Sequence, residues 1–251
     1  MYRPRTEDLC LPAADELDGI RDELTTSGYK VLPRFAEPAL LAALRDEAVR
    51  LSTGLAGHPE GTSISRDAHG RVLSMHYLDR HSDLLFDLTR LTPLADLAET
   101  LLESRCVPFL TEYFAKPAVR SEATPPHQDQ IFYQDHFGDE LAVTFWIALT
   151  DVTADDGVLQ YAVPQPKLGE MLKHRVSDVQ NFGAELVDDA GLTFVSAPVP
   201  AGGVVVHHSY AVHRSDEMRG TSPRSAFALN FRRSPHRQQV NPLSRRDSAN
   251  G

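Results

Sequence analysis

The segment TPPHQDQ at residues 124–130 places a histidine, His127, two positions before an aspartate, Asp129. On a β-strand, residues two apart point to the same face, so an imidazole nitrogen and a carboxylate oxygen can reach one ion. Two histidines and one carboxylate form a facial triad with open positions, which suits an iron(II) ion that also binds a cosubstrate and dioxygen. A His-x-Asp pair alone is common and also fits a solvated strand end, so a third ligand is needed.

A second candidate segment, GGVVVHHSYAVHRS at residues 202–215, contains three histidines. A glycine turn, an apolar run and then histidines are typical of a strand that reaches the rim of a β-barrel. His207 and His208 are adjacent, so on a strand they face opposite sides and at most one looks inward. His213 follows the strand, where a rim loop can turn it toward the ion. The residue pattern alone leaves the choice among these histidines open.

Arg224 opens a further apolar run, in which every second residue shares one face. That face also contains Ala226, Ala228 and Asn230, which indicates one fixed cation at the wall of a cavity lined by small residues. A guanidinium binds a carboxylate through two parallel hydrogen bonds, which suits the distal carboxylate of 2-oxoglutarate. The alternative is a surface arginine near a strand end.

A β-domain must position these side chains, because short apolar or alternating runs separated by turn residues follow residue 105. The predicted strands span residues 107–114, 118–122, 127–133, 141–149, 158–163, 193–198, 203–208 and 224–232. Before them, the periodicity predicts helices over 13–28, 37–53 and 83–105, the last interrupted near Pro93, and a short strand over 29–32. This order predicts a mainly β fold with flanking α-helices, a jelly roll.

We expect one domain over residues 1–251, because no repeat or linker divides the chain. It would have a helical N-terminal part to about residue 105, a β core over about 106–233 and a polar tail at 234–251. The net charge of −10 does not favour nucleic acid or anionic membranes as partners. Two cysteines cannot form a disulfide framework, and no secretory signal or apolar spanning segment is visible, so the expected compartment is the cytoplasm.

Taken in order, these segments resemble the phytanoyl-CoA dioxygenase (PhyH-like) family. The family pattern is a His-Gln-Asp motif after a proline, a strand with a tryptophan, an Asn/Asp-Gly-x-Leu turn, and a later His-x-Ser followed by an arginine. The matching residues here are 126–129, 145–151, 156–159, 213–215 and Arg224. The likeness covers roughly residues 108–232. It departs at 164–167, where Pro-Gln-Pro-Lys replaces the frequent Pro-Gly-Ser-His-Lys, so that part of the rim must differ.

The resemblance implies a double-stranded β-helix of the cupin-like type, iron(II), dioxygen, and 2-oxoglutarate as cosubstrate. The implied iron ligands are His127, Asp129 and His213. The residues implied at the distal carboxylate of 2-oxoglutarate are Arg224 and Ser215. Gln128 and Trp146 would line the cosubstrate pocket, although Trp146 is equally well a core aromatic residue. Because Asp129 is present where related halogenases have a small residue, the resemblance favours oxygen insertion over halogenation.

Substrate contacts are expected near the iron and on a lid. The candidate residues are Gln130, Phe132, Tyr133, Arg66, Arg71 and Lys116. Residues 54–71 are rich in Gly, Ser and His and are predicted to be a mobile loop. The longer segment 54–81 is predicted to be a substrate lid, whose arginines would bind a carboxylate or phosphate of the substrate. A plain solvated loop, and a surface lysine at a strand edge for Lys116, are the alternatives.

The expected reaction hydroxylates, or otherwise oxidises, an unactivated C–H bond of a small molecule, with succinate and carbon dioxide as coproducts. The substrate would be a natural-product intermediate or metabolite, and desaturation, epimerisation or ring formation are variants of the same chemistry. A cupin-like metal-dependent isomerase or a 2-oxoglutarate-independent dioxygenase would need the His/Asp set without the Arg224 anchor. A non-catalytic β-domain that binds a ligand is the remaining alternative, and the oligomeric state is not predicted.

Overall fold

The computed structural model describes residues 2–55, 62–118, 121–179 and 182–234. The helices are η1 Thr6–Asp8, α1 Leu17–Ser27, α2 Pro38–Gly54, η2 Leu78–Arg80, α3 Asp83–Arg90, α4 Leu94–Leu102 and α5 Gln130–Phe137. The strands are β1 Tyr29–Leu32, β2 Ser63–Arg66, β3 Val72–His76, β4 Cys106–Lys116, β5 Thr124–His127, β6 Ala142–Ala148, β7 Leu159–Val163, β8 His174–Val176, β9 Ala184–Leu186, β10 Thr193–Ser196, β11 Val204–His208, β12 His213–Ser215 and β13 Arg224–Arg233.

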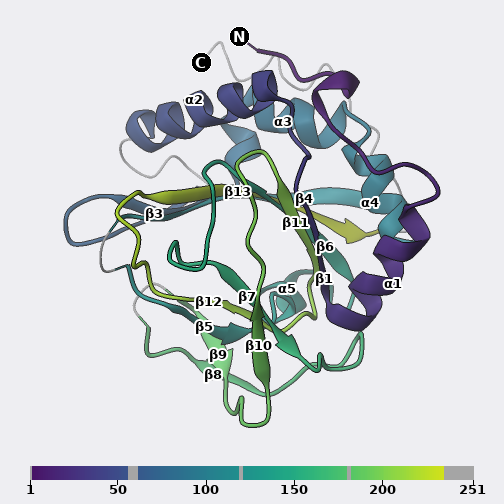
Figure 1. The fold of residues 1–251 in the computed structure, drawn as a ribbon, viewed down its shortest axis with the longest axis vertical. Coiled ribbons are helices and arrows are strands. Elements are labelled where there is room, and N and C mark those ends of the chain that lie inside the picture. The colour runs from purple at the N-terminus through teal and green to yellow at the C-terminus, as the bar shows by residue number, and fades with distance from the viewer. Residues whose placement is uncertain (1, 56–61, 119–120, 180–181, 235–251) are drawn as a thin grey trace.

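Two antiparallel sheets form the β part of the fold (Figure 1). The larger has seven strands in the order β1-β11-β6-β13-β4-β3-β2, and the smaller has four in the order β10-β7-β12-β5. Strands β8 and β9 form a separate two-stranded ribbon beyond the smaller sheet. The two sheets with helices outside them confirm the predicted jelly roll, a double-stranded β-helix.

Alternation along β6 explains the layering. Val143, Phe145 and Ile147 pack in one cluster with helical leucines such as Leu44, because successive strand residues point to opposite faces. Figure 1 shows α2 and α3 across this outer face of the seven-stranded sheet. Trp146 and Ala148 belong to a second cluster, shared with β7 of the smaller sheet. β6 is therefore buried on both faces, and its inner face borders the space between the sheets.

Local sequence signals define the helix ends. Gly28 has φ +80°, and its N–H donates to the Leu24 carbonyl to end α1, a conformation that glycine adopts without a Cβ clash. Pro93 stands at the N-cap of α4 and separates it from α3, as the sequence predicts. The predicted helices at 13–28 and 37–53 correspond to α1 and α2.

Three predicted elements are wrong. The strand predicted over 127–133 ends at His127, and α5 follows from Gln130 with Asp129 at its N-cap in a helical conformation. Of the strand predicted over 118–122, the described residues 118, 121 and 122 belong to no strand. The loop predicted over 54–71 contains β2, which pairs with β3 as a hairpin at the edge of the larger sheet. Residues 56–61 and tail residues 235–251 lie outside the described residues.

No helix among the described residues is long and apolar enough to span a membrane.

Candidate active site

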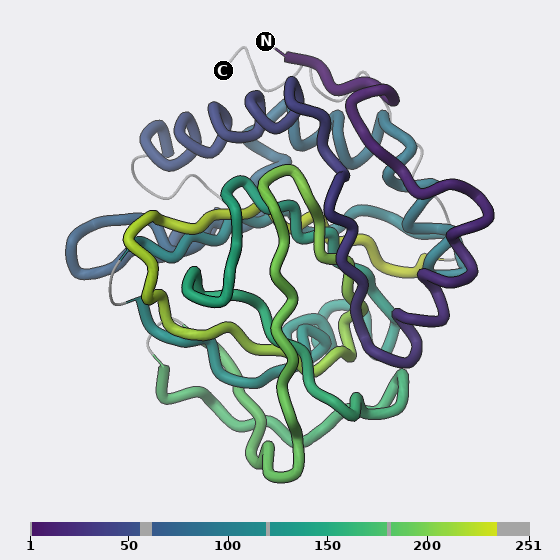
Figure 2. Tube along the Cα trace, viewed as in Figure 1, coloured from purple at the N-terminus to yellow at the C-terminus, as the bar shows by residue number. Residues whose placement is uncertain are grey.

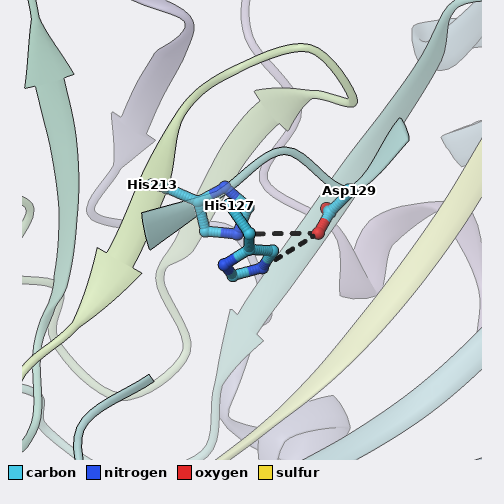
Figure 3. Close-up of side chains that lie close together, drawn as sticks. All are labelled: His127, Asp129 and His213. Atoms are coloured by element: carbon cyan, nitrogen blue, oxygen red, sulfur yellow. Dashed lines mark ion pairs between the residues drawn. The ribbon is translucent and has the colours of Figure 1, made fainter. Parts of the chain in front are cut away.

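His127, Asp129 and His213 converge between the sheets (Figure 3). One ligand atom from each lies within 4.8 Å of the others. The His127 Nε2 is 3.4 Å and the His213 Nε2 3.6 Å from the same carboxylate oxygen, Oδ1 of Asp129. The structure thus brings together the three residues that the sequence and the family resemblance single out as metal ligands.

Strand pairing explains how residues so far apart in sequence meet. β5 and β12 are antiparallel neighbours, and His127 lies directly opposite His213 in their register. Figure 2 shows the two segments running side by side in the smaller sheet. Asp129 is brought in by the turn from β5 into α5, and not by the strand geometry that the sequence argument assumed.

Hydrogen bonds fix both imidazoles as metal ligands. The Nδ1–H of His127 donates to the Pro125 carbonyl at 2.9 Å, and the Nδ1–H of His213 to the Ala211 carbonyl at 3.0 Å. Each Nε2 is left with a lone pair, the arrangement that ligating histidines need. Burial, together with the neighbouring His127, lowers the pKa of His213 to about 3, so this ring stays neutral. The donor set fits an iron(II) ion.

Asp129 supplies the negative charge of the site. Burial alone would raise its pKa, but the surrounding imidazoles of His213, His127 and His207 hold that pKa well below the usual value. His207 faces this carboxylate, with its Nε2 3.1 Å from Oδ2. The sequence pattern assigned no role to His207, and predicted only that at most one of the adjacent residues His207 and His208 faces inward.

Two buried cations lie side by side next to the second cluster. Arg224 and Lys116 are register partners on β13 and β4, and they are only 3% and 7% exposed. Arg224 donates to the Gly157 carbonyl at 2.7 Å and stacks over Trp146, with its Cζ 4.8 Å from the ring centre. The Lys116 Nζ donates to the carbonyls of Glu122 and Asp216.

The remaining residues predicted near the cosubstrate differ in their surroundings. Ser215 is buried on β12, two residues after His213. Gln128 uses both amide hydrogens on backbone, at Glu170 and Tyr210, and its Oε1 accepts from the Leu172 N–H. The side chain of Gln128 therefore holds neighbouring loops in place, and both of its amide hydrogens are used within the protein.

Among the residues predicted to contact substrate, Phe132 on α5 lies next to a metal ligand. The Phe132 ring centre is 6.0 Å from that of His127, and Phe182, which the sequence did not single out, is 4.7 Å away. The Tyr133 hydroxyl points to Asn230, 3.4 Å from its Oδ1, and Gln130 is buried with its amide nitrogen bonded to the Gly138 carbonyl.

The predicted lid arginines do not join this site. The guanidinium of Arg66 donates to the carbonyls of Gly70 and of Ser52 on α2, and that of Arg71 pairs with Asp67 at 2.7 Å. Both arginines therefore support the hairpin and its contact with α2. β2 and β3 lie at the opposite end of the larger sheet from β1 and β11. The β11 strand of His207 is five strands from β2 in this sheet, whereas β4, which contains Lys116, is two strands from it.

Comparison with known proteins gives a matching family model, curated relatives and solved structures of the same fold. Residues 24–226 match the model of the phytanoyl-CoA dioxygenase (PhyH) family. "Phytanoyl-CoA dioxygenase domain-containing protein 1" of Bos taurus is 30% identical over 126 residues, which cover 47% of this chain and only 42% of that relative.

Two solved structures are similar over most of their length. EvdO2 from Micromonospora carbonacea var. aurantiaca, complexed with 2-oxoglutarate, has a TM-score of 0.68 and 21% identity, covering 93% of this chain and 96% of that one. The epimerase SnoN from nogalamycin biosynthesis, in complex with Fe3+, alpha ketoglutarate and nogalamycin RO, has a TM-score of 0.66 and 22% identity, covering 88% and 85%. With the family match spanning most of the sequence, the chain belongs to the phytanoyl-CoA dioxygenase (PhyH) family of iron- and 2-oxoglutarate-dependent oxygenases.

Proposed function

We propose that the protein hydroxylates an unactivated C–H bond of a small molecule, using iron(II), dioxygen and 2-oxoglutarate. The observation that supports this best is the convergence of two Nε2 lone pairs and one carboxylate oxygen within 4.8 Å. Iron(II) held there would activate dioxygen with electrons from oxidative decarboxylation of 2-oxoglutarate, so that one oxygen atom enters the substrate and the other leaves in succinate.

In this proposal the protein binds and orients. His127 and His213 give neutral nitrogen donors, and Asp129 gives one negative charge, so the dication keeps a net positive charge that attracts an anionic cosubstrate. Three protein donors leave the other positions of an octahedral ion for small molecules. Asp129 occupies the place at which a halide would need room, so oxygen insertion is favoured over halogenation.

The distal carboxylate of 2-oxoglutarate is assigned to Arg224, with Lys116 beside it. Two buried cations are costly without a counter-charge. No carboxylate of the described residues lies within 4.0 Å of either cationic group, and Nε of Arg224 is buried without a hydrogen-bond partner. A carboxylate from the cosubstrate would meet both needs. Ser215 and Trp146 would complete the pocket wall.

The substrate would approach past aromatic side chains. Phe132 is 37% exposed, its ring is 5.8 Å from that of Phe182, and both rings face His127. Such a wall favours an apolar or ring-containing part of a substrate and keeps water from the metal. A natural-product intermediate of this kind is in line with SnoN, whose structure contains nogalamycin RO.

The proposal is tested by anaerobic loading with iron(II), followed by 2-oxoglutarate, air and a panel of cyclic natural-product intermediates. We expect succinate release that depends on one substrate class, with label from isotopic dioxygen in the product. The His127→Ala variant should abolish this release, and Arg66→Ala should leave it unchanged as a matched control. Stoichiometric product without incorporated oxygen would replace hydroxylation by epimerisation, desaturation or ring formation. Wild-type turnover by His127→Ala would contradict the metal assignment.

A further inference from the structure

The two oxygens of the Asp129 carboxylate have different neighbours. Oδ1 is the oxygen nearest to Nε2 of both His127 and His213, at 3.4 and 3.6 Å. Oδ2 is held by His207, whose Nε2 is 3.1 Å away. The carboxylate is therefore divided between the ligand cluster on one side and strand β11 on the other.

His207 can bind this oxygen only through a hydrogen on Nε2. An ionised carboxylate accepts hydrogen bonds and cannot donate one, so Nε2 of His207 must bear the hydrogen. The opposite ring nitrogen, Nδ1, then accepts in the neutral ring, and the Tyr161 hydroxyl lies 2.8 Å from it. The hydrogen-bond chain therefore runs from the Tyr161 O–H to His207 and from the His207 N–H to Asp129.

Packing keeps this chain in one geometry. Tyr161 is fully buried, and its ring stacks on Tyr29 at 3.9 Å with an interplanar angle of 8°. His207 is 2% exposed and lies opposite Tyr29 in the register of β1 and β11. Because both side chains are enclosed, neither can leave its partner without opening the space between the sheets.

We propose that His207 and Tyr161 are positioning residues that restrict Asp129 to one metal-binding oxygen. The inference rests on the proposed iron site. Three protein donors leave three positions on a six-coordinate ion, which a cosubstrate bound through two oxygens and dioxygen would fill. If Oδ2 were free, the carboxylate could bind the ion through both oxygens and take one of these positions. The hydrogen bond from His207 keeps that position available.

The proposal predicts different effects on the affinity for metal and on the affinity for 2-oxoglutarate. In His207→Leu, Asp129 is free to bind with both oxygens, so metal affinity should change by less than about threefold. Affinity for 2-oxoglutarate should fall about 10- to 100-fold, the size of effect that loss of an outer partner has on metal affinity or activity at other metal sites. His207→Gln retains an amide N–H near the place of Nε2 and should recover most of the cosubstrate affinity. A general packing defect would weaken both affinities together.

Removal of single hydroxyl groups gives a matched pair of milder variants. Tyr161→Phe keeps the ring stacked on Tyr29 but removes the hydrogen bond that holds Nδ1 of His207, so we expect a fall in 2-oxoglutarate affinity of about three- to tenfold. Tyr29→Phe removes the hydroxyl of the stacked partner, for which the described residues show no hydrogen bond to His207, and should leave both affinities unchanged.

The experiment is an anaerobic calorimetric titration of iron(II) into each apoprotein, followed by titration of 2-oxoglutarate into the loaded protein. Cosubstrate binding at wild-type strength in both His207→Leu and Tyr161→Phe, or parallel loss of metal and cosubstrate affinity in both, would overturn the proposal. A crystal structure of metal-loaded His207→Leu should show both Asp129 oxygens at the ion. Wild-type protein that binds iron(II) but no 2-oxoglutarate would instead contradict the proposed function, and this inference with it.

Discussion

Arg224→Met should weaken 2-oxoglutarate binding and at the same time stabilise the cosubstrate-free protein. The guanidinium of Arg224 is buried, and burial lowers its pKa to about 10. The described residues give it one hydrogen bond, at the Gly157 carbonyl, and no carboxylate partner. Methionine fills similar space without a charge, so the variant removes the anion anchor and its desolvation cost together.

Both magnitudes follow from these contacts. Loss of one partner of a buried, hydrogen-bonded charge pair costs about 2–5 kcal/mol, and Lys116 would retain part of the attraction, so we take about 2–3 kcal/mol. At about 1.4 kcal/mol for each factor of ten, KM for 2-oxoglutarate rises about 30- to 100-fold. One pKa unit corresponds to about 1.4 kcal/mol, so the unpaired charge costs on the order of 3 kcal/mol. Loss of the Gly157 bond offsets about 1 kcal/mol of this gain.

The assay pairs steady-state 2-oxoglutarate consumption with thermal unfolding in the absence of cosubstrate. A net gain of about 1–2 kcal/mol raises Tm by on the order of 5 °C in a chain of this size. Arg232→Met is the matched control, because Arg232 lies on the same strand, is half-buried and already pairs with Glu140 at 2.8 Å. It should leave KM unchanged. An Arg224→Met protein with wild-type KM for 2-oxoglutarate would refute the role of Arg224 as the anchor. A lower Tm together with that unchanged KM would leave Arg224 a structural residue.

Three further substitutions test the surroundings of Arg224 and the outer face of β6. Burial, and then the charge of Arg224, lower the pKa of Lys116 to about 7 despite the opposing effect of Asp216 and Glu217. The Lys116 cation is present below that pH and lost above it, so KM for 2-oxoglutarate should rise as pH increases through about 7. Lys116→Met should flatten this pH profile. Gly157→Ala should destabilise the protein by about 1–3 kcal/mol and raise KM for 2-oxoglutarate, because Gly157 has φ +63° and an added Cβ would lie 2.6 Å from Cδ of Lys116. Urea denaturation and steady-state kinetics measure the two effects. Phe145→Ala should cost about 3–5 kcal/mol in urea denaturation and leave iron(II) affinity unchanged, because Phe145 packs on the outer, helix-covered face of β6.

Strong local periodicity made most of the fold predictable. The leucine stripe of α2, the glycine stop after α1 and the apolar runs of β6, β11 and β13 each determine their element almost alone. The β2–β3 hairpin was missed because its partly exposed strands lack a clear alternation and gain their pairing from β4. Such edge strands depend on tertiary contacts that no local window contains.

The site was predictable where residue type alone limits the chemistry. Two histidines and an aspartate in family order identified the triad, and a lone arginine on a face of small residues singled out Arg224, whose role as anchor remains a proposal. The surroundings were not predictable, because Tyr161 and Phe182 look like ordinary core or loop aromatic residues in the sequence. Their relation to His207 and His127 exists only after the two sheets face each other.

The His-x-Asp pair meets at the metal for a reason other than strand alternation. His127 is the last residue of β5, and Asp129 has helical angles, φ −57° and ψ −28°, at the start of α5. Gln128 between them is fully buried, and its amide holds the backbone at Glu170, Leu172 and Tyr210. With the middle residue tied to its surroundings on one side, the chain can turn into a helix and still direct the carboxylate of Asp129 to the imidazole of His127. The buried, hydrogen-bonded glutamine at the centre of the motif therefore helps to fix the turn that brings the two ligands together.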